Sequence, residues 1–191
     1  MKQKQNVTKL TLAFLTVFGG VLAGYSVHAE ESSAKALPDS HFASKCKELA
    51  DFTPDIELLQ ISAGVSDCAT HKDPVRKLSI FLSGLIKVQF DARRVEDVTI
   101  GSATMFYQML TFLKMTEVEK EQFKRDGDEF SEEVRVLTCA EMRRQGPPTY
   151  HPWWFVKLAQ KSSKNEQGFK IKEIDAAAEW DGVLAKYCGA R

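Results

Sequence analysis

The sequence predicts an all-α protein, a compact bundle of about six to seven helices tied by two disulfides. Apolar residues recur at helical spacing over most of the chain, strand-like alternation is nearly absent, and the cysteines form an even set of four. Length agrees with this class, because 191 residues with 43% apolar side chains are enough for one core. We therefore expect one helical domain.

The N-terminus has the pattern of a secretory signal peptide. Three lysines precede an apolar run from Leu10 to Gly24, which is short for a membrane span of about 20 residues. Val27 and Ala29 stand at the two positions that a signal peptidase reads, so we expect cleavage between Ala29 and Glu30. An uncleaved N-terminal anchor is the alternative. No later segment has the composition of a second span.

Cleavage divides the chain into three parts and changes its charge. We expect a signal peptide at 1–29, a flexible mature N-terminus at 30–39 and a single helical domain at 40–191. The full chain has 26 basic and 26 acidic residues. Cleavage of the leader takes away three lysines and no acid, so the formal net charge of the mature chain is −3. A general nucleic-acid binder normally has a basic excess, so this class is excluded. The expected location is the periplasm or the medium.

The cysteines fit an exported protein. Cys46, Cys68, Cys139 and Cys188 all lie beyond the leader, and an even count in an exported chain predicts two disulfides. Four cysteines allow three connectivities, and the simplest joins sequence neighbours, Cys46 with Cys68 and Cys139 with Cys188. The chain lacks C-x-x-C, so we expect no metal and no cofactor.

Helix boundaries follow from caps and apolar spacing. Asp73 and Pro74 begin the clearest helix, which is apolar nearly all round and therefore the expected centre of the bundle, with Gly84 allowing close approach by a neighbour. A narrow polar stripe along it includes Ser83 and Lys87. Other helices are expected over 40–51, 55–66, 102–113, 117–125, 131–146, 152–161 and 176–188, with a capping box at Thr116 and Glu119, a turn at 126–128, and Asp175 as the last cap.

Common catalytic signatures are missing. The sequence has no G-x-S-x-G, no H-E-x-x-H and no Walker loop, so we expect a non-catalytic protein, although enzymes without local motifs remain an alternative. Met105 and Met109 have the i, i+4 spacing of a soft-copper pair, but among Phe and Leu we interpret them as core. Eight acids between Glu117 and Glu133 predict a solvated face, or alternatively a docking surface for a basic partner.

The most unusual segment is the aromatic loop, residues 146–155, with the sequence GPPTYHPWWF. One interpretation is an aromatic plug that packs the loop onto the bundle. Another is a partner-binding hot spot, because aromatic residues on a stiff backbone anchor interfaces well. The binding candidates are Tyr150, His151, Trp153 and Trp154.

Two function classes follow. The first is an exported, non-catalytic binding protein that acts on another envelope or secreted protein as an adaptor, inhibitor, chaperone-like or immunity-type factor. The alternative is a small-ligand-binding protein or enzyme in which Tyr150, His151 and an acid such as Glu141 converge on a pocket. Peripheral membrane contact through the Trp residues and Lys157, Lys161 and Lys164 is a further possibility.

Overall fold

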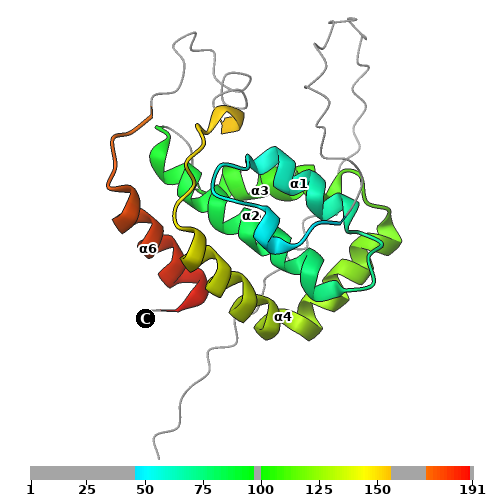
Figure 1. Cartoon of the computed structure of the whole chain (residues 1–191). Coiled ribbons are helices and arrows are strands. Elements are labelled where there is room, and N and C mark those ends of the chain that lie inside the picture. Colours follow the sequence, from blue (N-terminus) through cyan, green and yellow to red (C-terminus); the bar gives the residue numbers. More distant parts are fainter. Residues whose placement is uncertain (1–45, 97–99, 156–170, 190–191) are drawn as a thin grey trace, which may run out of the picture. The chain divides into compact units, whose positions relative to one another are not determined.

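A computed structural model describes residues 46–96, 100–155 and 171–189, so the predicted signal peptide and residues 30–45 lie outside the described part. The fold is all-α, as predicted, and the described residues contain no strand, only an isolated antiparallel bridge between Val95 and Ile171. The elements in chain order are η1 (Leu49–Asp51), α1 (Leu58–Asp67), α2 (Pro74–Arg94), α3 (Ile100–Phe112), α4 (Glu117–Gln145) and α6 (Ala176–Cys188) (Figure 1).

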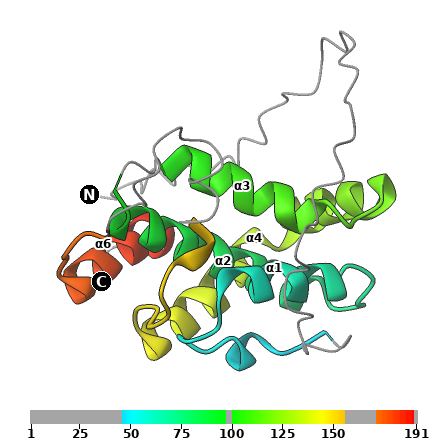
Figure 2. The ribbon, with the colours of Figure 1, turned by 90° about the horizontal axis from the view of Figure 1, so that it is seen from above.

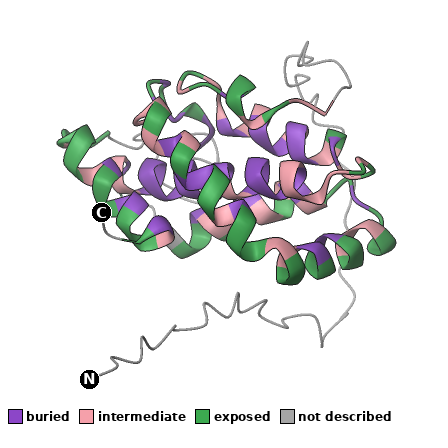
Figure 3. Ribbon diagram, turned by 60° about the horizontal axis from the view of Figure 1, so that its bottom comes forward, coloured by how far each residue is buried: buried purple, intermediate pink, exposed green. Residues whose placement is uncertain are grey.

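Helix α2 is the centre of the bundle. The Asp73 side chain accepts the Arg76 backbone N–H, and Pro74 occupies the first turn, as the cap pattern predicts. The helix contacts α1, α3, α4 and α6, and it runs between α3 on one side and η1 on the other (Figure 2). From residue 77 to residue 92 every residue except Leu82 is buried, which Figure 3 shows as purple along the central helix.

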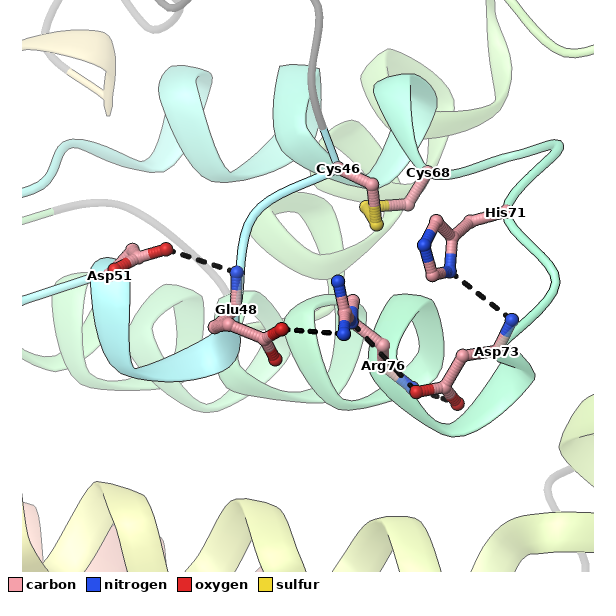
Figure 4. Close-up of polar contacts among 7 residues, drawn as sticks. All are labelled: Cys46, Glu48, Asp51, Cys68, His71, Asp73 and Arg76. Atoms are coloured by element: carbon pink, nitrogen blue, oxygen red, sulfur yellow. Dashed lines mark hydrogen bonds and ion pairs between the residues drawn. A yellow bond between two sulfur atoms is a disulfide. The ribbon is translucent and has the colours of Figure 1, made fainter.

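The polar stripe of α2 is buried at Ser83 and Lys87. Ser83 donates to the Ile80 carbonyl, and the Lys87 ammonium donates to the carbonyls of Phe52 and Thr53. Residues 46–56, which we call the strap, therefore cover this side of α2. An ion pair between Arg76 and Glu48 fixes the start of the strap, beside the first disulfide (Figure 4).

Two early helix boundaries differ from expectation. Of the helix predicted over 40–51, the described part contains only the 3-10 turn η1, and α1 begins at Leu58 rather than at Asp55. The reason is tertiary: the carbonyls of Thr53 and Pro54 bond to Lys87 and to the Thr149 N–H, so they do not begin a helix. The Asp175 cap of α6 is confirmed, whereas most of the helix predicted over 152–161 lies outside the described residues.

Helix α4 is continuous where a turn was expected at 126–128. Thr116 and Glu119 form the predicted capping box, and Gly146 with φ 78° ends the helix. Between them Asp126 is buried and accepts from the Lys77 ammonium at 2.7 Å and from the Gln122 amide at 2.6 Å. Docking on α2 therefore keeps Gly127 within the helix, despite its low helix propensity.

The interpretation of Met105 and Met109 as core residues is wrong. Helix α3 packs through Ala103, Tyr107 and Thr111, which are buried, and this leaves Met105 and Met109 68% and 54% exposed. Apolar residues occur all round α3, so spacing alone does not identify its inner face.

The two disulfides join sequence neighbours, Cys46 with Cys68 and Cys139 with Cys188. Each disulfide lies in a different cluster of buried apolar residues. Cys68 belongs to the larger cluster of α1, α2, α3 and the aromatic loop, and Cys139 and Cys188 belong to a smaller one with Trp180. No helix among the described residues is long and apolar enough to cross a membrane.

Close packing at Gly84 gives the first testable consequence. A Cβ atom at this position would collide with the Tyr107 hydroxyl, which donates to the Phe81 carbonyl in the core. We expect Gly84→Ala to lower the free energy of unfolding by about 1–3 kcal/mol in urea titrations, because the core cannot admit the methyl group. Gly101→Ala is the matched control, since its Cβ meets nothing within 4 Å. An equal effect of both substitutions would contradict the close packing.

Candidate functional site

The aromatic loop starts where α4 ends and runs back over α2. Gly146 adopts a positive φ, and Pro147 and Pro148 cannot continue the helix. The Thr149 N–H then donates to the Pro54 carbonyl of the strap at 3.0 Å. The loop therefore joins the strap over the C-terminal half of α2 (Figure 1).

A buried carboxylate of α2 anchors this loop. Oδ2 of Asp91 accepts from the Tyr150 hydroxyl and from the Trp154 indole N–H, each at 2.9 Å. Its Oδ1 accepts from Nε and Nη2 of Arg94, at 3.0 and 2.6 Å. The side chain of Asp91 is fully buried, so four donors replace the water that its charge would otherwise require.

Electrostatics make Tyr150 a structural donor. Burial raises the pKa of Asp91, and the neighbouring Arg94 cation partly opposes this rise. Burial and the Asp91 charge raise the pKa of Tyr150 well above its ordinary value, so its phenol keeps its proton. The Arg94 guanidinium also lies over the rings of Tyr150 and Phe90, 5.2 and 5.1 Å from their centroids.

The side chains of the loop alternate between the core and the solvent. Tyr150, Trp154 and Phe155 are buried, and the Trp154 ring stacks on Phe106 of α3 with centroids 6.1 Å apart. His151 is exposed and Trp153 is 54% exposed. The rings of these two residues, which we call the His–Trp pair, lie 4.4 Å apart between centroids. The structure thus separates the four predicted site residues into two anchors and two accessible side chains.

The predicted pocket triad does not assemble. The Tyr150 hydroxyl faces the buried Asp91, His151 faces solvent, and Glu141 bonds to Arg144 and Gln145 on its own helix. In the described part of the chain these contacts do not bring Tyr150, His151 and Glu141 together on one pocket.

Lys87 is a polar core residue that sequence reasoning missed. Its ammonium lies 3.1 and 2.8 Å from the carbonyls of Phe52 and Thr53, and burial lowers its pKa to about 8, although Asp91 one turn away opposes the shift. The i, i+4 spacing of Lys87 and Asp91, two residues of opposite charge, was the available signal.

The acidic segment is mostly a solvated face of α4. Glu117, Glu121 and Glu132 pair with Lys120, Arg125 and Arg135 on the same helix, and Asp126 pairs with Lys77 of α2. Half of the eight acids thus already have a cationic partner within the chain.

A polar cleft of about 270 Å³ adjoins the Lys77–Asp126 pair, at the turn between α1 and α2. His71 lines this cleft, and its Nδ1 accepts the Asp73 N–H (Figure 4). Among the described residues no three His, Cys, Asp or Glu side chains form a group that could hold a metal ion.

Comparison of the chain with protein-family models, with curated proteins and with solved structures found no match. Function is therefore inferred from the chemistry of the loop itself.

The in–out arrangement of the loop predicts unequal effects of two neighbouring substitutions. Tyr150→Phe removes a donor from a buried carboxylate, so we expect the free energy of unfolding to fall by about 1–3 kcal/mol. His151→Ala removes an exposed ring and should change the free energy of unfolding by less than about 0.5 kcal/mol. Urea unfolding followed by far-UV circular dichroism measures both. If His151→Ala proves as costly as Tyr150→Phe, the loop is anchored differently.

The lowered pKa of Lys87 predicts a dependence of stability on pH. Between about pH 8 and 10.5 the unfolded chain keeps the Lys87 proton and the folded chain loses it, so deprotonation favours the folded state. The free energy of unfolding should therefore rise relative to Lys87→Met by about 1–3 kcal/mol across this window. Parallel urea titrations of both proteins at each pH measure this difference, in which the contributions of the other titrating groups cancel. A constant difference would show that Lys87 titrates normally.

Proposed function

We propose that this chain is an exported, non-catalytic binding protein that captures another envelope or secreted protein through the His–Trp pair. The observation that carries the proposal is the exposure of Trp153 and His151 on a loop whose neighbouring side chains are fixed in the core. Trp is among the residues that contribute most to binding at protein interfaces.

Rigidity of the loop supports binding by lowering its entropic cost. Tyr150 and Trp154 flank the exposed pair and bond to one oxygen of Asp91, and the Trp153 N–H donates to the His151 carbonyl at 2.7 Å. A partner therefore does not have to order the backbone on binding, and more of the contact energy remains as affinity. The polar edges of both rings can donate hydrogen bonds to a protein surface.

Export is the second part of the proposal. Two disulfides are consistent with an oxidising compartment. The leader pattern of residues 1–29 supports the periplasm, reached after cleavage between Ala29 and Glu30. A protein partner in the envelope would be accessible there.

Affinity capture from envelope extracts tests the binding surface. The wild-type chain should retain a partner that Trp153→Ala and His151→Ala retain at least about tenfold less, because truncation of a hot-spot residue costs about 2 kcal/mol. Val118→Ala is the matched control, since Val118 is an exposed apolar residue on α4, 73% accessible.

Quantitative mass spectrometry of the eluates measures the retained partner, and thermal unfolding confirms that each variant is folded. Equal capture by wild type and Trp153→Ala would contradict the role of the loop. If Val118→Ala reduces the amount of retained partner as much as Trp153→Ala does, the partner adheres nonspecifically.

A further inference from the structure

The outer face of α3 is an exposed apolar ridge without charge. Met105, Met109 and Leu113 are 68%, 54% and 73% exposed, and the small exposed Gly101 continues their four-residue spacing. The helix, residues 100–112, contains no Asp, Glu, Lys or Arg. The exposed faces of α4 and α6 differ, because they carry many charged side chains. A ridge of this kind is typical of an interaction surface rather than of a solvated helix.

The core fixes which face of α3 is free. The Tyr107 hydroxyl donates to the Phe81 carbonyl of α2, and Thr111 bonds to Ser62 of α1. Figure 2 shows α3 along the edge of the bundle, on the side of α2 opposite to η1. Rotation of α3 to hide its methionines would break these buried bonds, so no rearrangement of α3 among the described residues covers the ridge.

We propose that the α3 ridge binds a second copy of this chain, in an antiparallel contact about a twofold axis between Met105 and Met109. A twofold contact places the same helix on both sides, so neither copy buries a charge against apolar side chains. Faces such as that of α4 would bring unpaired charges onto the methionines, which is costly.

Side-chain sizes also fit this contact. In the antiparallel arrangement Met105 of each copy faces Met109 of the other, and Gly101 faces Leu113, so a large side chain meets the position without one. Flexible methionines adapt well to such contacts. A lipid surface suits the ridge less, because α3 has neither the Lys/Arg face nor the tryptophans typical of interfacial helices.

Sedimentation velocity of the purified chain over a wide concentration range tests the proposal. Three large side chains per copy form a small interface, so we expect a dimer with a dissociation constant on the order of 1–100 μM. Met109→Lys and Leu113→Lys should each raise this constant at least about tenfold, because each places two ammonium groups in the apolar contact.

Val136→Lys is the matched control, because Val136 is 54% exposed on α4 and should leave the dimer unchanged. Trp153→Ala should also leave it unchanged, which separates this test from that of the His–Trp pair. A chain that stays monomeric to about 1 mM overturns the proposal, as does a dimer that survives both ridge substitutions. If a monomeric chain co-sediments with phosphatidylglycerol vesicles and Met109→Lys does not, the occupant is instead a lipid surface.

Discussion

The buried polar groups of α2 determine how the rest of the chain docks. Lys87 holds the strap, Asp91 holds the aromatic loop, and Lys77 holds α4 through Asp126. Each of these side chains would be costly to bury alone, and each forms hydrogen bonds or an ion pair with one distant segment, to which Arg94 of the same helix adds a pair for Asp91. Apolar contacts stabilise the bundle, and these polar contacts determine which segment packs on which side of α2.

This arrangement explains why the aromatic loop combines fixed and exposed side chains. Asp91 accepts from two residues four apart, Tyr150 and Trp154, and so fixes both ends of a short run. His151 and Trp153 lie between these fixed points and turn outward. The aromatic plug and the proposed binding surface, which the sequence offers as alternatives, would therefore be two faces of one loop.

Local signals in the sequence predicted much of the fold, and contacts between distant segments account for what it missed. Caps at Asp73, Thr116 and Asp175 were readable because a capping side chain bonds within its own first turn. The burial of Lys87 was not predicted, because its partners lie 34 and 35 residues earlier in the chain. Met109 was interpreted as core because apolar residues occur all round α3, so their spacing does not identify its inner face.

The same core connects the two proposed surfaces. Trp154, an anchor of the His–Trp pair, stacks on Phe106 of α3, next in sequence to Met105 on the outer ridge. Helix α3 thus supports the loop from within, while the described residues leave Met105 and Met109 on its outer face exposed. A dimer through α3 would present two His–Trp pairs on one assembly, and a partner with two matching sites would bind with the higher effective concentration of a bivalent contact. Under these two proposals the loop would supply recognition of the partner, and the ridge would supply valency.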